Sequence, residues 1–316
     1  MKITPYLIGL LFILTISKSN AQDVVRTTIP DTTTYWHKKN VIGLDFSQIA
    51  FINWSVGGNN SISGLLKGAF LRNYTKGNLR WKNELIVRYG VNKQEERELR
   101  KTDDAVQLNS TIGYRHDSIS NWYHSAKLNF NTQFTSGYAY PNTDLAISKA
   151  FAPAYWFLGV GAEYSNKEKK LNAYFSPLTQ KTTLVLDQRL ADQGAFGVDK
   201  AVYDADGNLI RHGKKSRTEV GILVTNQWKN EIYKNIFLDH RLSLYTDYLN
   251  NFGNVDVDWQ VQLDLVVNQY VKANIGTNLV YDDDIKSKKE IDGVQVTQGP
   301  KIQFKQLLGV GLSYTF

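Results

Sequence analysis

The feature that most constrains this chain is a strict two-residue alternation of apolar and polar side chains. The last residues, 303–316, read QFKQLLGVGLSYTF, with Leu312, Tyr314 and Phe316 on one parity and mostly small or polar side chains on the other. Successive side chains of an extended strand point to opposite faces, so this segment has one apolar face. A soluble sheet can show the same pattern. The length of the run and its terminal aromatic residue favour the last strand of a transmembrane barrel.

The same alternation recurs from Val41 to the end of the chain. It predicts about twelve strands, an even number, as bacterial single-chain barrels require. Pro177 indicates a bulge or a split in one of them. The predicted strands are 41–50, 61–74, 79–90, 104–115, 121–135, 154–164, 170–186, 217–228, 235–248, 254–267, 270–282 and 301–316.

The connections between these strands alternate in length. Those at 75–78, 116–120, 165–169, 229–234 and 268–269 are short, whereas those at 51–60, 91–103, 136–153, 187–216 and 283–300 are long, with 249–253 as the exception. Short turns on one rim and long loops on the other are typical of outer-membrane barrels. The pattern predicts an all-β fold, a transmembrane antiparallel up-and-down β-barrel with periplasmic turns and a periplasmic C-terminus. The alternative is a secreted β-sandwich.

The N-terminus carries the pattern of a secretory signal. Lys2 precedes the apolar run PYLIGLLFILTI, and the small residues Ser19 and Ala21 follow it. This arrangement predicts cleavage after Ala21. We therefore expect a signal peptide at 1–21, a periplasmic segment at 22–40 and an outer-membrane barrel with long extracellular loops at 41–316.

The composition excludes several classes of protein. The chain has no cysteine, so it can form neither a disulfide framework nor a lipid anchor on cysteine. Loss of the signal peptide lowers the net charge from +7 to about +5, without the clustered basic residues that nucleic-acid binding requires. After the signal, the sequence contains no apolar run long enough for a transmembrane helix.

Four blocks of sequence resemble a known family. They are WSVGGNNSIS at 54–63, KTDDAVQLNSTIGY at 101–114, WYHSAKLNFNTQF at 122–134 and GYAYP at 137–141. In the first block Trp54, Gly57, Gly58 and Asn60 occur in the order that characterises the domain-of-unknown-function 3078 family of Gram-negative outer-membrane β-barrel proteins. The resemblance implies a barrel and neither a catalytic residue nor a cofactor.

The end of the chain resembles a second pattern. A C-terminal Phe with apolar residues at alternate positions is similar to the signal by which the outer-membrane assembly machinery recognises its clients. By this resemblance Tyr314 and Phe316 are the assembly signal, and that machinery and outer-membrane lipids are expected partners.

The histidines do not form a hydrolase pattern. A catalytic His and Ser of a lipid-modifying barrel must lie on one strand face, within hydrogen-bond distance of each other. His124 and Ser125 are adjacent, and His240 and Ser243 are three residues apart, so each pair falls on opposite faces. We therefore expect that the protein is not an enzyme.

Three polar loops have a structural and a functional interpretation. The segment 203–213 begins like a calcium loop, but its glycine comes too early, and a β-hairpin turning near Gly207 explains it better. The acidic segment 281–293 is expected to be a solvated loop, without a metal site. The glycines and asparagines at 56–60 fit a tight turn, although a loop folded into the barrel mouth, where backbone groups meet a ligand, remains the alternative.

Charged residues on the parity that faces the barrel interior are the candidate determinants of selectivity. In the barrel order, the basic residues fall mostly on one arc and the acidic ones, which include Asp239 and Asp247, mostly on another. Two opposed charged walls would create a field across the lumen. The alternative is that the charges neutralise one another in a plugged interior. The candidates are Arg80, Lys82, Arg88, Lys127, Asp256, Asp258, Asp264, Lys272 and Lys305.

These features predict a narrow channel or a solute-binding transporter of the outer membrane, with a small solute as its cargo. A structural or interaction barrel whose extracellular loops bind a partner is the alternative. An outer-membrane enzyme that modifies lipid is a weaker alternative.

Overall fold

The computed structural model describes residues 34–49, 59–250, 252–291 and 294–316. The chain divides into two units, Met1–Thr34 and Tyr35–Phe316, and only the second is described below. The family loop residues Trp54, Gly57 and Gly58 lie outside the described residues, whereas Asn60 lies within them.

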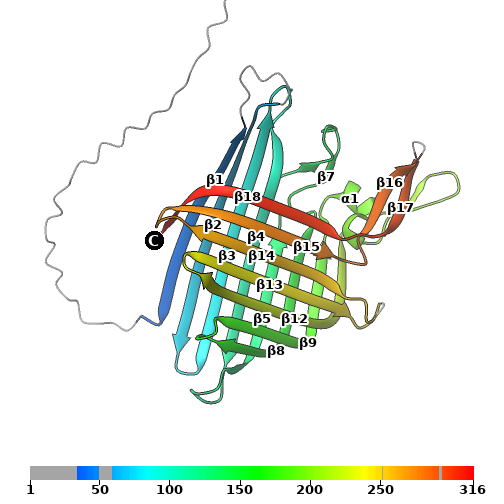
Figure 1. Ribbon diagram of the computed structural model, residues 1–316. Helices are drawn as coiled ribbons and strands as arrows, with labels where there is room; N and C mark the ends of the chain where they lie inside the picture. The colour runs from blue at the N-terminus through cyan, green and yellow to red at the C-terminus, as the bar shows by residue number, and fades with distance from the viewer. Residues whose placement is uncertain (1–33, 50–58, 251, 292–293) are drawn as a thin grey trace, which may run out of the picture. The chain divides into compact units, whose positions relative to one another are not determined.

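Within the described ranges, twelve long antiparallel strands close into one barrel (Figure 1), which confirms the predicted fold class. The barrel strands are β1 (Trp36–Ile49), β2 (Ser61–Lys76), β3 (Leu79–Gln94), β4 (Arg100–Tyr114), β5 (Trp122–Thr132), β8 (Ala154–Asn166), β9 (Leu171–Leu184), β12 (Ser216–Tyr233), β13 (Ile236–Asp247), β14 (Asp256–Val266), β15 (Val271–Tyr281) and β18 (Gln303–Thr315).

Each barrel strand pairs with its neighbour along the chain, and β1 pairs with β18 to close the ring. The closing seam runs from Val41 opposite Thr315 to Phe46 opposite Val310. Backbone hydrogen bonds between Asn40 and Phe316 extend it by one pair, at 2.9 and 3.0 Å. Closure satisfies the backbone groups that an open sheet edge would leave unpaired, which is the condition for spanning a bilayer with strands.

Two strand boundaries differ from the predicted ones in ways that matter. β1 begins at Trp36, so residues 36–40 of the segment expected to be periplasmic pair with β2. β3 and β4 extend beyond the predicted strands, so the connection predicted as a long loop at 91–103 is only 95–99. The polar side chains of residues 92–94 concealed the continuation of β3, because a strand that rises out of the membrane needs no apolar face.

The outward side chains form an apolar band. Leu44, Leu66, Leu158, Val160, Leu308 and Val310 are all exposed on this face. Aromatic side chains lie at both ends of it. At the end with short turns these are Trp36, Trp81, Tyr114, Trp122, Tyr314 and Phe316, and at the end with long loops Tyr89, Phe134, Trp156 and Phe304. An apolar band between two aromatic girdles is the surface of a transmembrane barrel.

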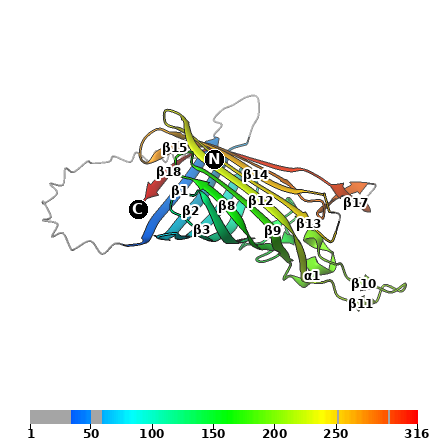
Figure 2. The ribbon, with the colours of Figure 1, turned by 90° about the horizontal axis from the view of Figure 1, so that it is seen from below.

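The loops carry structure of their own. Two-stranded hairpins form in three of them: β6 (Gly137–Tyr138) with β7 (Ala146–Ser148), β10 (Val202–Tyr203) with β11 (Leu209–Arg211), and β16 (Lys286–Ile291) with β17 (Val294–Pro300). The hairpin β10–β11 confirms the prediction for segment 203–213, with Gly207 at a φ of 85° in its turn. Figure 2 shows this hairpin at the same end of the barrel as α1 (Gln188–Asp192).

A small apolar core supports these loops. It contains Ala152, Val185, Leu190, Ala191 and Val198 from two different loops. Asp187 caps α1 by accepting a hydrogen bond from the Leu190 amide at 3.0 Å. The hydrogen bond from Lys149 lowers the pKa of Asp187 below its ordinary value. No helix in the described part of the chain is both long and apolar enough to span a membrane.

A bulge in β9 changes which residues face the lumen. The pairing of β9 shifts between Phe175 and Leu178 on the β8 side and between Ser176 and Thr179 on the β12 side, which confirms that Pro177 marks a bulge. The bulge lies close to Gly161 of β8, where a Cβ atom would be 2.0 Å from the Phe175 carbonyl oxygen. Before the bulge Asn172 and Tyr174 face inward, and after it Thr179 and Lys181 do.

Candidate functional site

The barrel encloses a polar cavity of about 460 Å³. Amide side chains are the largest group in its lining, and hydroxyl groups, charged groups and the apolar side chains of Leu71 and Leu223 also contribute. Tyr174 and Phe157 are its aromatic members. The amide-bearing side chains on inward-facing positions are Asn73, Gln107, Asn109, Asn129, Asn131, Asn172, Gln227 and Gln260.

Near the turn end, one carboxylate is held by two cations. Glu163 of β8 contacts Arg80 at 2.8 Å and Lys82 at 3.3 Å, both from β3. The side chains of Glu163 and Arg80 are each 7% exposed. Arg80 also lies over the Tyr123 ring, with its guanidinium carbon 3.3 Å from the ring centroid. We call Glu163, Arg80, Lys82 and Tyr123 the Glu163 cluster.

Lys127 of β5 points into the same cavity without an acidic partner. Its ammonium donates a hydrogen bond to Thr225 Oγ1 at 2.9 Å and lies 5.2 Å from the centroid of the Tyr174 ring. None of the described acidic side chains forms an ion pair with it. Lys127 therefore offers a positive charge to whatever enters the cavity.

One ion pair crosses the lumen at mid-height. Arg241 of β13 contacts Glu84 of β3 at 3.1 Å, and its Nε contacts Asp239 at 3.3 Å. In the barrel order of the described strands, five strands separate β3 from β13 on either side, so the Arg241–Glu84 pair joins opposite walls. This ion pair divides the cross-section of the lumen, and we call it the Arg241–Glu84 strut. A path through the barrel must pass beside it.

Asp103, near the loop end of β4, joins two further cations. Arg88 of β3 lies 3.1 Å from one carboxylate oxygen, and Lys305 of β18 lies 2.8 Å from the other. Since β18 and β4 are not neighbours, this contact too spans part of the lumen.

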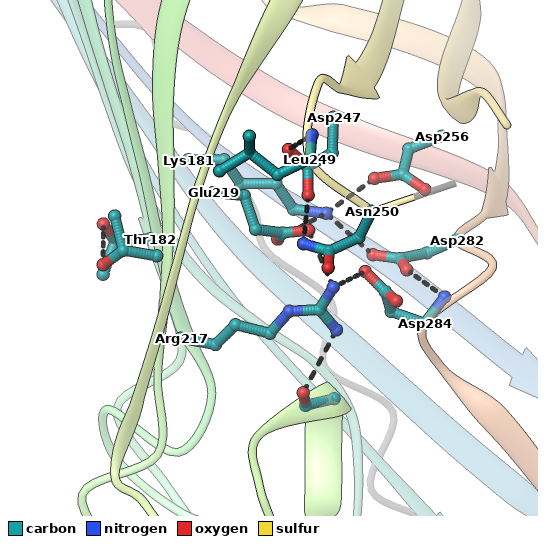
Figure 3. Close-up of polar contacts among 12 residues, drawn as sticks. Lys181, Thr182, Arg217, Glu219, Asp247, Leu249, Asn250, Asp256, Asp282 and Asp284 are labelled. Carbon is teal, nitrogen blue, oxygen red and sulfur yellow. Dashed lines mark hydrogen bonds and ion pairs between the residues drawn. The ribbon is translucent and has the colours of Figure 1, made fainter. Parts of the chain in front are cut away.

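The mouth of the barrel is its end with the long loops. The arrangement of charges there is the opposite of that in the Glu163 cluster, because one lysine lies among several acids (Figure 3). Lys181 Nζ lies 2.6 Å from Asp256, 3.3 Å from Asp282 and 3.6 Å from Glu219. The Lys181 side chain is 5% exposed and that of Glu219 is 3% exposed. We call Lys181, Glu219, Asp256 and Asp282 the Lys181 cluster. A buried lysine with three carboxylate neighbours is held in its charged form by them.

Arg217 connects this cluster to the loops. Its guanidinium contacts Glu219 at 2.9 Å and Asp284 at 2.8 Å, and it donates a hydrogen bond to the Gly197 carbonyl at 3.2 Å. Figure 3 shows Arg217 between the Lys181 cluster and the loop that precedes β12. The 185–215 loop is therefore bonded to the barrel rim at Gly197.

The mouth also contains the described carboxylates that come closest to a metal-binding arrangement. One oxygen each of Asp256, Asp282 and Asp283 lies within 4.8 Å of the others. Hard divalent cations prefer such oxygen ligands. However, Lys181 already places an ammonium group against two of these three acids, so the group is neutralised from within the chain. The sequence expectation of no metal site stays a prediction.

The remaining predicted lumen residues, Asp258, Asp264 and Lys272, form no ion pair within 4 Å among the described residues. Asp258 accepts a hydrogen bond from Gln260 at 3.3 Å, and Asp264 accepts one from Gln262 at 2.6 Å. Lys272 faces inward near the turn end of β15, opposite Gly311 of β18. On the outer face, the Tyr314 and Phe316 rings stack with centroids 5.7 Å apart.

The charged residues are not sorted into two opposed walls. Arg80, Lys82, Arg88 and Lys305 were expected to form a basic arc, yet each contacts a carboxylate from another strand. Asp239 and Asp256, expected on the acidic arc, contact Arg241 and Lys181. These pairs match the alternative in which interior charges neutralise one another. Among the described residues, no ion pair within 4 Å is formed by the candidates Lys127, Asp258, Asp264 and Lys272.

Sequence reasoning did not select Glu84, Glu163, Lys181, Glu219 or Arg241. Glu84 and Arg241 lie on the inward parity of predicted strands, so alternation could have identified them. Lys181 could not be found by parity, because the bulge at Pro177 reverses the faces within its strand.

Comparison with known proteins gives a family match and structural neighbours. Residues 46–138 match the family model described as "Protein of unknown function (DUF3078)". None of the curated proteins compared matches the chain.

Two solved structures similar to this chain are the translocator domain of the autotransporter NalP from Neisseria meningitidis and an outer-membrane channel from Pseudomonas putida F1. The first is 11% identical, covers 90% of this chain and 89% of its own, and has a TM-score of 0.37. The second is 11% identical, covers 88% of this chain and 95% of its own, and has a TM-score of 0.39. The match over residues 46–138 agrees with the resemblance to the DUF3078 family that the sequence blocks indicate.

Proposed function

We propose that this protein spans the outer membrane and that its interior is a narrow path or binding site for small polar solutes. The observation that carries the proposal is the amide-rich cavity crossed by the Arg241–Glu84 strut. Outer-membrane insertion is supported by the closed barrel, its apolar band and its two aromatic girdles. The short turns and the C-terminus are assigned to the periplasm, with the long loops outside.

The lining of the cavity favours hydroxylated solutes. Asn and Gln side chains each offer donors and an acceptor, which is what sugar-like hydroxyl groups require. The cavity of about 460 Å³ is within the range of small-molecule sites. Because most interior cations and acids are paired with each other, a neutral solute would pass without displacing a counter-ion.

The strut sets the size limit in this proposal. Glu84→Gln removes the charge on one wall, while Arg241 keeps Asp239 as its partner on β13. The change therefore releases the crossing contact without leaving Arg241 unpaired. Lys229→Gln is the matched control, because Lys229 contacts Asp239 at 3.0 Å between adjacent strands and does not cross the lumen.

Liposome swelling tests the proposal with uncharged sugars of increasing size. Purified wild-type protein, Glu84→Gln and Lys229→Gln are reconstituted, and the rate of entry of arabinose and raffinose is measured. We expect slow arabinose entry for the wild type and the control, and several-fold faster entry for Glu84→Gln. Absence of sugar entry in all three folded proteins would remove the transport proposal and leave the barrel fold intact.

The folded loops favour a second candidate, a barrel whose loops bind a partner. The 133–153 and 185–215 loops share an apolar core, and they still expose Leu145, Ile147, Leu186 and Ile210. Such apolar side chains on an ordered scaffold are typical of interaction surfaces. A barrel that is impermeable to solutes in the swelling experiment would favour this candidate. Neither candidate includes an enzymatic step.

A further inference from the structure

On the outer face, two cations lie side by side near the turn end of the barrel. Lys38 of β1 is directly opposite Arg72 of β2 in the strand register. Both share the parity of Ile42, Leu44 and Leu66, which are exposed on the apolar band. They therefore point toward lipid rather than toward the lumen.

These cations line a depression of about 450 Å³, together with Trp36, Trp81 and Asn83. The Trp36 ring centroid lies 5.8 Å from that of Trp81 and 5.3 Å from that of Tyr74. Trp and Tyr at this level form the girdle at the membrane interface. The depression is thus open where lipid headgroups meet hydrocarbon.

Neighbouring side chains hold the walls in place. The Trp81 indole donates a hydrogen bond to Ser110 Oγ at 2.8 Å, and that hydroxyl donates to Asn83 Oδ1 at 2.8 Å. Asn83 in turn donates to the Arg72 carbonyl at 3.2 Å. Arg72 Nη1 donates to Asn40 Oδ1 at 2.8 Å and to the Leu71 carbonyl at 2.7 Å, which orients the guanidinium. The site is preorganised without a ligand.

The depression lacks a negative charge of its own. Neither Lys38 nor Arg72 forms an ion pair with any acid in the part of the chain that the structure describes. The described outward positions of β1 to β4 include one acid, Asp104, which lies at the loop end and is paired with Lys101. Cations on a lipid-facing surface are costly unless an anion accompanies them. The anion must therefore come from outside the chain.

The depth of the two cations fits a lipid phosphate. Lys38 and Arg72 lie two residues further into the band than Trp36 and Tyr74. Two residues correspond to about 7 Å along a strand, which the long side chains of Lys and Arg can span toward the interface. Arginine matches phosphate oxygens with two parallel hydrogen bonds, and lysine adds a second charge.

We propose that this depression binds the phosphodiester of an anionic glycerophospholipid from the membrane leaflet at the turn end. Lys38 and Arg72 neutralise the phosphate, Asn83 lies beside the polar headgroup, and Trp36 and Trp81 pack against the glycerol and the start of the acyl chains. The site does not depend on the proposed transport function, because it lies on the opposite face of the strands.

Native mass spectrometry of the detergent-purified protein tests this site. The wild type, Lys38→Gln/Arg72→Gln and Lys76→Gln are each mixed with equal amounts of phosphatidylglycerol and phosphatidylcholine of the same acyl chains. Lys76→Gln is the matched control, since Lys76 is on the same face at the end of β2 and lies over Tyr35. Folded protein is confirmed in every case by its heat-modifiable mobility in gels.

We expect the wild type and Lys76→Gln to retain phosphatidylglycerol about tenfold better than phosphatidylcholine, the ratio for one net charge-assisted hydrogen bond. The double variant should lose this preference. The single variant Arg72→Lys, which keeps the charge but not the two-pronged geometry, should retain an intermediate preference. Equal retention of both lipids by the wild type, or an unchanged preference in the double variant, would overturn the proposal. Displacement of phosphatidylglycerol by excess inorganic phosphate would show a free-anion site and overturn the assignment to lipid.

Discussion

The Glu163 cluster and the Lys181 cluster, which lie toward opposite ends of the lumen, have central residues of opposite charge. In the Glu163 cluster, near the turns, one carboxylate is held by Arg80 and Lys82. In the Lys181 cluster, at the mouth, one ammonium is held by Asp256, Asp282 and Glu219. Both central side chains are almost fully buried, so neither can be satisfied by water.

The difference lies between the two clusters and not between the two whole ends, because at the loop end Asp103 is also held by two cations, Arg88 and Lys305. Around the Lys181 cluster, Asp247, Asp283 and Asp284 add further acids, of which Asp284 contacts Arg217. Around the turn end, Lys127 adds an unpaired cation. A charged solute that passes beside the Lys181 cluster would therefore meet acidic groups before it meets Lys127.

Removal of Lys181 should have the largest effect on the unfolding free energy. Lys181→Met leaves Asp256 and Asp282 without their counter-ion, while Glu219 keeps Arg217, and this should cost about 4 kcal/mol of unfolding free energy. Urea unfolding of the protein in lipid vesicles measures it. Lys214→Gln breaks an exposed pair with Asp199, so this control should lose less than about 1 kcal/mol. Equal losses in the two variants would mean that the Lys181 cluster is not desolvated.

An arginine introduced on the lipid-facing side of a strand should have the next largest effect on the unfolding free energy. Val261 and Gln262 are adjacent near the middle of β14, with Val261 facing out and Gln262 facing in. Val261→Arg should cost about 3 kcal/mol in bilayers, the typical value for arginine at mid-membrane. Gln262→Arg should cost far less, because its side chain enters the polar lumen. If both variants unfold at the same urea concentration, the assignment of faces is wrong.

Replacing the central residue of the Glu163 cluster should lower the unfolding free energy less than replacing Lys181 does. Glu163→Gln leaves Arg80 and Lys82 without an anion, but Lys82 is partly exposed and Arg80 keeps its contact with the Tyr123 ring. We expect a loss of about 2 kcal/mol, below that for a fully buried unpaired charge. The same urea titration tests the order. A loss larger than that of Lys181→Met would reverse the comparison between the two clusters.

Alternation in the sequence was sufficient for the fold but not for the clusters. The twelve strands and their inward and outward faces follow from period-two patterning, since a barrel strand has the same two faces along its length. The partners of the inward charges do not follow. Arg80 and Glu163 come from β3 and β8, which are not neighbours, so their contact depends on how closely the walls approach across the lumen.

Local irregularity accounts for the most important omission. Strict parity counted from Tyr174 would place Lys181 on the lipid face, where it could not meet Asp256. The bulge at Pro177 adds one residue and brings Lys181 inside. Pro177 was recognisable as a bulge signal, but the register on its far side depends on pairing with β8 and β12.

Ion currents through single molecules in planar lipid bilayers test the central claim most directly. We predict small discrete conductance steps for the wild type, with a preference for cations because carboxylates outnumber cations at the mouth. Asp258→Asn removes an inward acid that has no cationic partner among the described residues, so it should shift the reversal potential under a salt gradient toward anions. A folded, membrane-inserted wild type and Glu84→Gln variant that both carry no current would contradict a solute path through this barrel.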